Sequence, residues 1–166
     1  MSKNAIVFGG SGFLGSHVAD ALSENGYKVA LFDLQASRYL RPDQTMVVGS
    51  ILDTEKVNYA IKGQDIVFHF AGLSDLDMGK DQPIEVANQN IIGTINLLNE
   101  SIKANIKRFV FASTIYVYSD LGGFYRCSKQ ATELFIEEFN KCYGLNFTVL
   151  RYGSLYGPRA SASNGI

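Results

Sequence analysis

Short apolar runs alternate with longer amphipathic segments along the chain. Runs rich in β-branched and aromatic residues predict strands at 5–8, 27–32, 45–48, 65–70, 109–112 and 146–150. Apolar residues at helical spacing predict helices at 13–25, 84–104 and 125–143. A further short helix is predicted between a cap at Asp53 or Thr54 and a stop at Gly63.

The apolar faces of two helices can be assigned from this spacing. The first helix, which Gly26 stops, carries Phe13, Leu14, Val18, Ala21 and Leu22. The long helix directs toward the sheet Ile91, Ile92, Ile95, Leu98 and Ile102. We therefore expect both helices to pack on the strands through these residues.

The strands are apolar throughout and are separated by helices. This order predicts an α/β fold of the Rossmann type, a doubly wound parallel sheet with helices on both faces. In such a sheet a ligand binds outside the carboxyl ends of the strands. The length of 166 residues fits one such domain, which we place at 1–166.

Charge and cysteine content bear on the partners of the domain and on its cellular compartment. The net charge is −1, so nothing indicates a nucleic acid or an anionic membrane as partner. Cys127 and Cys142 lie about 22 Å apart along one predicted helix, too far to bridge. No signal segment and no apolar run of about 20 residues is present, and we expect a cytoplasmic protein.

A glycine-rich turn follows the first strand directly and opens the first helix. A side chain at Gly9 or Gly12 would block the approach of a pyrophosphate to the backbone, and Gly15 permits close packing of helix on strand. The helix N-terminus offers free N–H groups to phosphates. A purely structural turn is the alternative, and the strand–turn–helix context argues against it.

Asp33 closes the second strand. A carboxylate there accepts hydrogen bonds from both hydroxyls of an adenosine ribose and repels a 2′-phosphate, which favours NAD over NADP. A solvated or capping Asp is the alternative, and Arg38 nearby leaves NADP open.

A candidate chemical centre lies later in the chain. Tyr125 and Lys129 stand at i and i+4 on one helix face, where an ammonium is expected to lower the Tyr pKa and make it a general base. Thr114 ends the fifth strand beside Ser113 and can orient a reacting oxygen. A strand-end Thr that binds loop backbone is the alternative.

The motifs together resemble those of the extended short-chain dehydrogenase/reductase family, in the group of NAD-dependent nucleotide-sugar epimerases and dehydratases. The matching segments are, in order, residues 9–15 (GGSGFLG), Asp33, 69–72 (HFAG), 90–94 (NIIGT), 113–114 (ST), Tyr118, 125–129 (YRCSK), 150–151 (LR) and 156–159 (YGPR). The match covers essentially the whole chain.

The resemblance implies a role for each matching position. It implies a pyrophosphate contact at Gly9, Gly12, Phe13 and Leu14, a ribose contact at Asp33 and an adenine contact at Ile51. It implies that the cofactor passes over Phe70, Ala71 and Gly72, with Asn90 bracing the loops, and that Ser113, Tyr125, Lys129 and Tyr152 surround the nicotinamide end. Thr114, Tyr125 and Lys129 would be catalytic. His17 and His69 are interpreted as structural, and no metal site is expected.

The chain departs from the family pattern in several places. Gly49-Ser50 lacks the carboxylate that often contacts adenine, and Ile115-Tyr116 replaces the Asp-Glu of dehydratases, which argues against 4,6-dehydration. The segment 120–124 is short and lacks proline, so the substrate mouth should be reshaped. Ser154 stands where Asn is frequent.

The resemblance implies a nucleotide-sugar substrate. The expected first step is hydride transfer to NAD from the carbon that bears a sugar hydroxyl, which we expect to be C4. The resemblance also implies a homodimer formed through the two long helices. Epimerase and net dehydrogenase or reductase activity stay open, as do a non-nucleotide substrate and a non-catalytic NAD-binding regulator. Because the family's sugar-nucleotide contacts come largely from a C-terminal domain, we expect that substrate domain to be absent from this chain.

Overall fold

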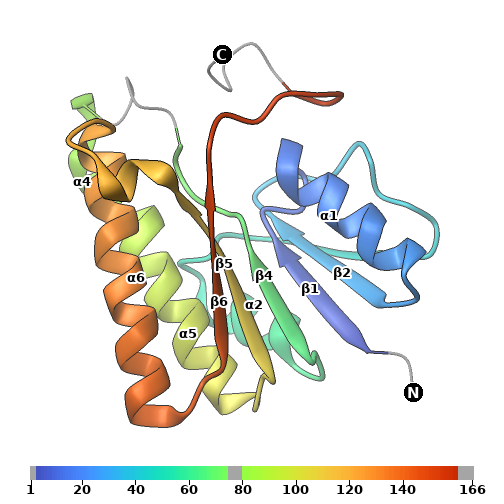
Figure 1. Cartoon of the computed structure of the whole chain (residues 1–166). Helices are drawn as coiled ribbons and strands as arrows, with labels where there is room; N and C mark the ends of the chain where they lie inside the picture. Colours follow the sequence, from blue (N-terminus) through green and yellow to red (C-terminus); the bar gives the residue numbers. More distant parts are fainter. Residues whose placement is uncertain (1–2, 75–79, 161–166) are drawn as a thin grey trace.

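A parallel sheet forms the centre of the computed structural model, which describes residues 3–74 and 80–160 (Figure 1). Its strands are β1 (Asn4–Phe8), β2 (Lys28–Asp33), β3 (Thr45–Val48), β4 (Ile66–His69), β5 (Arg108–Thr114) and β6 (Phe147–Tyr152). The order across the sheet is β3-β2-β1-β4-β5-β6, and each neighbouring pair is parallel. The predicted doubly wound fold is therefore confirmed.

Helices cover the sheet on both faces (Figure 1). The helices and helical turns are α1 (Phe13–Glu24), α2 (Thr54–Ile61), α4 (Pro83–Val86), η1 (Ala87–Ile92), α5 (Gly93–Lys103), η2 (Ile115–Tyr118) and α6 (Gly123–Tyr143). α1 packs on one face, over Val7, Val29 and Leu31. α2, α5 and α6 lie on the other face, where Phe8, Phe109 and other apolar side chains form the larger core.

The long helix predicted at 84–104 is interrupted. Its middle turn, η1, is a π-helix, in which each N–H bonds five residues back and the turn is wider than in an α-helix. The wider turn changes which side chains face the sheet: Leu97 and Leu98 are buried, whereas Ile92 is 53% exposed. The prediction that Ile92 faces the sheet is wrong for this reason.

Two further differences from the prediction concern the buried face of α1 and the ends of β5 and β6. Ala21 of α1 is exposed, and the tightly packed positions are the small residues Gly15, Ser16 and Ala19, so the assignment of Ala21 to the apolar face is wrong. β5 and β6 run farther than predicted because Ser113 and Thr114 pair with Arg151 and Tyr152. Residues 161–166 of the predicted domain 1–166 lie outside the described residues.

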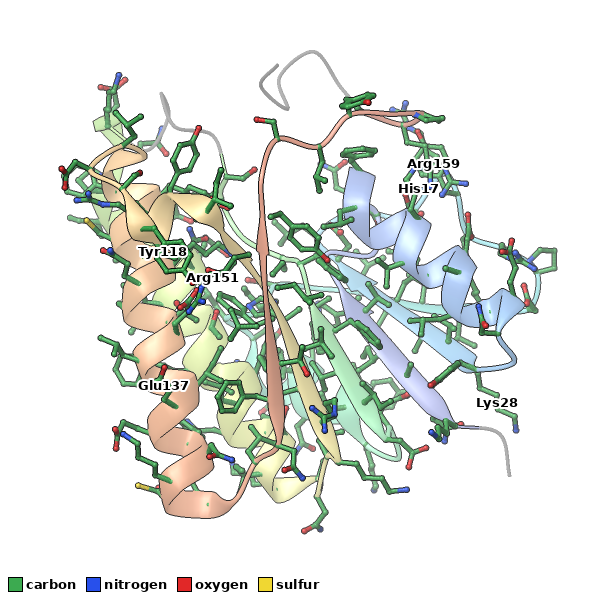
Figure 2. The ribbon with its side chains drawn as sticks, in the orientation of Figure 1. His17, Lys28, Tyr118, Glu137, Arg151 and Arg159 are labelled. Atoms are coloured by element: carbon green, nitrogen blue, oxygen red, sulfur yellow. The ribbon has the colours of Figure 1, made fainter. Side chains whose placement is uncertain are left out.

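The segment after β6 returns across α1. Arg159 Nη2 donates to Asp20 Oδ2 at 2.7 Å, and His17 Nε2 donates to the Pro158 carbonyl at 2.8 Å (Figure 2). These contacts give His17 the structural role expected of it. They also hold residues 153–155 beside the carboxyl ends of the strands, where the candidate site lies.

Candidate functional site

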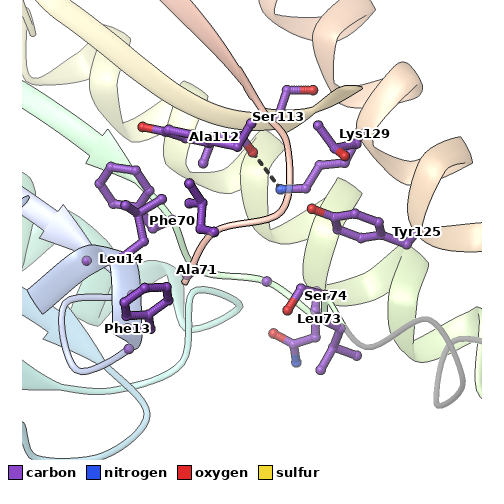
Figure 3. Close-up of a pocket in the computed structure, with 18 of the residues that line it drawn as sticks. Phe13, Leu14, Phe70, Ala71, Leu73, Ser74, Ala112, Ser113, Tyr125 and Lys129 are labelled. Atoms are coloured by element: carbon purple, nitrogen blue, oxygen red, sulfur yellow. Dashed lines mark hydrogen bonds between the residues drawn. The ribbon is translucent and has the colours of Figure 1, made fainter. Parts of the chain in front are cut away.

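A cleft of about 890 Å³ lies at the carboxyl ends of the strands. β1 leads into its glycine turn, and β4, β5 and α6 supply the opposite wall (Figure 3). The predicted site residues that line the cleft are Gly9, Gly12, Phe13, Leu14, Asp33, Ile51, Phe70, Ala71, Gly72, Ser113, Thr114, Tyr125, Lys129 and Tyr152. The structure thus brings together in one cleft groups that are far apart in the sequence.

The glycine turn is shaped by three different constraints. Gly9 has a φ of +82°, and a Cβ there would lie 2.6 Å from the Ala71 nitrogen. A Cβ on Gly15 would lie 2.0 Å from the Gly9 carbonyl oxygen, which shows how closely α1 approaches the turn. Gly12 has an ordinary φ and its Cβ would meet only the Gly9 oxygen, at 3.4 Å. Gly9 and Gly15 are therefore required by the turn itself, and Gly12 leaves the cleft side of the turn open.

The N-terminus of α1 is free to receive an anion. Gly12 caps the helix without a side-chain hydrogen bond, and the first turn carries no acidic residue. The unpaired N–H groups of a helix start and its partial positive charge favour phosphate binding.

Asp33 is anchored beside this turn. Its Oδ2 accepts a hydrogen bond from the Ser11 backbone N–H at 2.9 Å, which fixes the carboxylate at the end of β2 and at the edge of the cleft. The position fits a group that receives ribose hydroxyls.

Asn90 lies behind the cleft and not in its wall. The side chain is 2% exposed, accepts from the Leu73 N–H at 2.7 Å, and donates to the Leu73 carbonyl and to Ser128 Oγ, both at 2.9 Å. A Cβ on Gly72 would lie 2.7 Å from Asn90 Oδ1. Asn90 therefore ties the loop after β4 to α6, in line with the bracing expected of it.

The candidate catalytic groups meet at the end of β5. Lys129 is 6% exposed and donates from Nζ to the Ala112 carbonyl at 2.8 Å, the bond drawn in Figure 3. The same Nζ lies 5.6 Å from the centre of the Tyr125 ring. Thr114 is 5% exposed, and its Oγ1 accepts from the Tyr116 N–H at 3.2 Å, so it also caps η2, the alternative role of a strand-end Thr.

The expected pKa shift of Tyr125 is wrong in direction. Burial raises the pKa of Tyr125, and Tyr116 raises it further. Burial also lowers the pKa of Lys129 to about 8, although Glu133 acts to raise it. Removal from water disfavours the charged form of both groups, and the Lys129 ammonium already donates to a backbone carbonyl. Tyr125 is therefore a neutral phenol at pH 7, whereas Lys129, with a pKa of about 8, still carries its charge there.

The burial of Lys129 predicts a pH-dependent stability. The pKa of Lys129 is about 8 in the folded chain, against the usual 10.5, so between these pH values the unfolded chain binds more protons than the folded one. The free energy of unfolding therefore rises with pH across this range. Below pH 8 the folded state bears the full free-energy cost of burying the charged ammonium. We expect Lys129→Met to raise the free energy of unfolding at pH 7 by at most about 3 kcal/mol, a gain that disappears toward pH 10.5. Denaturant titrations at several pH values measure this. A gain that does not change with pH, or an equal one in the exposed control Lys62→Met, contradicts it.

Ser113 has a contact that its predicted cofactor-binding role does not include. Its hydroxyl donates to Glu133 Oε1 at 2.5 Å, on the α6 side of the sheet, so that hydroxyl is already engaged inside the protein. Ser113 still lines the cleft, but its side chain links two elements.

Ile51, Tyr152 and His69 complete the set of predicted residues. Ile51 is 5% exposed and fills the space beside Gly93. Tyr152 lies at the end of β6, where burial raises its pKa. His69 is buried, and its Nε2 donates to Thr94 Oγ1 at 2.8 Å. Burial, with the nearby Lys129, holds the pKa of His69 well below its usual value, so it is neutral and structural.

Several cleft residues were not predicted. They are Phe32, Leu34, Leu73, Ser74, Glu85, Gln89, Ala112, Gly153 and Leu155. Gly15, predicted only to let α1 pack closely, also lines the cleft, as do Gly49, Ile115, Tyr116 and Ser154, which the sequence marks only as departures from the family pattern. Most are sequence neighbours of predicted residues. Glu85 and Gln89, joined by a 2.8 Å hydrogen bond, belong to no motif and reach the cleft only because α4 and η1 pass its edge.

Metal-ligand clusters and membrane-spanning helices are both absent from the described part of the chain. No group of three His, Cys, Asp or Glu side chains there could hold a metal ion. No helix within residues 3–74 and 80–160 is long and apolar enough to cross a membrane.

Fold and cleft together define a class of protein. A doubly wound sheet whose first strand enters a glycine turn, and whose second strand ends in a carboxylate, is the architecture of a dinucleotide-binding domain. Comparison with known proteins narrows this class. Residues 5–165 match the model of the NAD dependent epimerase/dehydratase family, and the chain belongs to that family.

Relatives support this assignment. A putative UDP-glucose 4-epimerase of Methanocaldococcus jannaschii is 32% identical in an alignment 174 residues long, which covers 93% of this chain and 56% of that protein. The structure of UDP-glucose 4-epimerase from Thermotoga maritima with UDP-glucose superposes with a TM-score of 0.88 at 36% identity, covering 94% of this chain and 57% of that one.

The Thermus thermophilus UDP-glucose 4-epimerase complex with NAD gives a TM-score of 0.90 at 27% identity, covering 97% of this chain and 59% of that one. The chain thus spans somewhat more than half the length of the relatives it matches.

Proposed function

We propose that this chain is the cofactor-binding part of an NAD-dependent enzyme that acts on a nucleotide-sugar and begins by oxidising a sugar hydroxyl, at C4. The observation that carries the proposal is the shared cleft. Tyr125, Lys129 and Thr114 line the same cavity as the glycine turn and Asp33. A cofactor held by the turn and the carboxylate would extend toward these three residues.

The residues present fit NAD. The open side of Gly12 and the uncapped start of α1 suit a pyrophosphate, Asp33 suits the adenosine ribose, and Ile51 offers an apolar surface to adenine. Phe70, Ala71 and Gly72 would lie along the cofactor, and Tyr152 would lie beside the nicotinamide. When bound, NAD supplies the hydride acceptor for the oxidation.

The chain's own groups handle the proton. Tyr125 Oη takes the proton of the sugar hydroxyl, and Thr114 Oγ1 orients the oxygen that loses it. Because burial raises the pKa of Tyr125, its phenolate is a strong base, and the ammonium of Lys129 is needed to stabilise it. Lys129 would also bind the ribose hydroxyls next to the nicotinamide.

Asp33 is expected to set the choice of cofactor. Asp33→Asn removes the charge but keeps an oxygen for the Ser11 N–H, so affinity for NAD should fall about 10- to 100-fold, the effect of losing charged hydrogen bonds. Discrimination against NADP should weaken because the repelling carboxylate is gone. Isothermal titration with both cofactors measures this, with the exposed Asp43→Asn as control. An unchanged NAD/NADP ratio would show that Asp33 does not read the ribose.

The relatives support a nucleotide-sugar as the substrate, and the residues next to Thr114 argue against a 4,6-elimination. Relatives include UDP-glucose 4-epimerases and a UDP-N-acetyl-alpha-D-glucosaminuronate decarboxylase. Ile115 and Tyr116 line the cleft next to Thr114, and neither is a carboxylic acid that could assist a 4,6-elimination.

A panel of UDP-, GDP- and dTDP-sugars, given to the full-length protein with NAD, tests the proposal. Reduced nicotinamide is followed by absorbance and products by NMR. A sugar isomer without net NADH identifies an epimerase, and NADH with a keto sugar identifies a dehydrogenase. No reaction across the panel contradicts a nucleotide-sugar substrate.

We also propose a cytoplasmic homodimer. Cys127 and Cys142 are exposed free thiols, which suits a reducing compartment. Ile92 of η1 and Leu134 and Phe135 of α6 are exposed apolar side chains on the two long helical segments, and a partner copy would cover them. Light scattering tests this, and a monomer at working concentration refutes it.

A further inference from the structure

The last paired residues of β5 and β6 lie at the wall of the cleft. Thr114 pairs with Tyr152, and both line the cavity. One step back along the strands, Ser113 pairs with Arg151. The positions of Thr114 and Tyr152 therefore depend on how the Ser113–Arg151 pair is held.

A single carboxylate holds that pair. Glu133 of α6 is 8% exposed; its Oε1 accepts from Ser113 Oγ at 2.5 Å, and its Oε2 accepts from Arg151 Nη2 at 2.7 Å. Arg151 Nε lies 3.1 Å from Oε1 as well. Glu133 stands one helical turn after Lys129 and two turns after Tyr125. The carboxylate thus joins α6, the helix that carries the proposed base, to both β5 and β6.

The contacts continue to the turn after Thr114. Arg151 Nη1 donates to the Tyr118 hydroxyl, and the guanidinium lies 4.8 Å from the centre of the Tyr118 ring (Figure 2). Tyr118 ends η2, whose first residues, Ile115 and Tyr116, line the cleft. η2 is therefore fixed at one end by Thr114 and at the other by Arg151.

We infer that Glu133 is a positioning residue, which holds Thr114, Tyr152 and η2 in register with Tyr125 and Lys129. This inference rests on the proposed function. A buried ion pair is weak evidence for stability, because its desolvation cost offsets much of its attraction. Its geometric effect is large here, because three elements that carry site residues meet at one carboxylate.

Glu133 also contributes charge. The titratable groups around Lys129 are Tyr125 and Glu133 on α6 and the buried His69 on β4. Since Glu133 acts to raise the pKa of Lys129, its neutralisation would lower that pKa below about 8. The unpaired Arg151 would act in the same direction. Activity that needs the Lys129 ammonium would then be lost at a lower pH.

The experiment uses Glu133→Gln in the full-length protein, with NAD and the substrate found in the panel. We expect kcat to fall on the order of 100-fold, as for a small misplacement of reacting groups, with little change in KM or NAD affinity. The alkaline limb of the pH–rate profile should move to lower pH. Glu137→Gln, an exposed Glu one turn farther along α6, is the matched control and should resemble wild type.

Two further variants separate the outcomes. Ser113→Ala removes only the link to β5; it should lower kcat without moving the pH profile, and it replaces Glu133→Gln if that variant does not fold. If Glu133→Gln folds and keeps the wild-type kcat and pH profile, the positioning role is overturned. If Glu133→Gln does not fold, a wild-type kcat in Ser113→Ala overturns it instead. Tyr125→Phe, measured in parallel, tells the two proposals apart: if it is active, the proposed function fails, whatever Glu133 does.

Discussion

Replacement of Tyr125 with Phe is expected to lower kcat by about 10²- to 10⁴-fold, the range of a lost general base. The phenol oxygen is the only atom removed, and the hydrogen bond from Ser128 Oγ to Tyr125 uses the backbone carbonyl, which the variant keeps. NAD affinity and the melting temperature should therefore stay close to wild type. Steady-state kinetics, NAD titration and thermal unfolding together measure this pattern.

A matched control lies on the same helix. Tyr143 ends α6, is 63% exposed and is remote from the cleft lining, so Tyr143→Phe should keep full activity. Near wild-type turnover in Tyr125→Phe would show that Tyr125 is not the general base. A loss of activity that is matched by a loss of NAD binding would instead assign Tyr125 to the cofactor.

Replacement of Gly15 with Ala should damage both the fold and cofactor binding. The new Cβ would lie 2.0 Å from the Gly9 carbonyl oxygen and 2.8 Å from its carbon, so α1 or the turn must move. Both partners are backbone atoms and cannot rotate away. We expect a loss of about 3 kcal/mol in the free energy of unfolding, at the upper end for overpacking, and no measurable NAD binding. Denaturant unfolding and calorimetric titration measure the two effects.

Gly12→Ala is the contrasting variant. Gly12 has a φ of −75° and its Cβ would stand 3.4 Å from the nearest atom, so the fold should lose less than about 1 kcal/mol. The methyl group would nevertheless occupy the open side of the turn, and NAD affinity should fall. Normal NAD binding by Gly12→Ala, or a fully stable Gly15→Ala, would show that the turn does not act as described.

The fold was largely predictable because its signals are local. Apolar runs such as 5–8 and 109–112 are typical of central strands, and Gly9, Gly12 and Gly15 belong to a turn with strict spacing. Since parallel strands end at one edge, residues at strand ends converge, and Asp33, Thr114 and Tyr152 do line one cleft. The roles assigned to these residues stay predictions.

The features that sequence did not predict depend on three-dimensional contacts. The π-helical turn that exposes Ile92 leaves the same apolar spacing as a regular helix. The pKa of Tyr125 rises because the side chain is buried and Tyr116 acts in the same direction, neither of which the spacing of Tyr125 and Lys129 can reveal. In the sequence Glu133 is one of several acids on an amphipathic helix, and only the pairing of β5 with β6 places Ser113 and Arg151 against it.

Oxidation at C4 of the sugar is tested directly by following the hydrogen on that carbon. The full-length protein is given NAD and the reactive nucleotide-sugar of the panel, deuterated at C4, and the label is traced by NMR and mass spectrometry. We expect deuterium to move between sugar and nicotinamide, so that it appears in reduced cofactor or returns to C4 of a new isomer. Loss of the label to water, or a product formed with the C4 hydrogen never transferred, would contradict it.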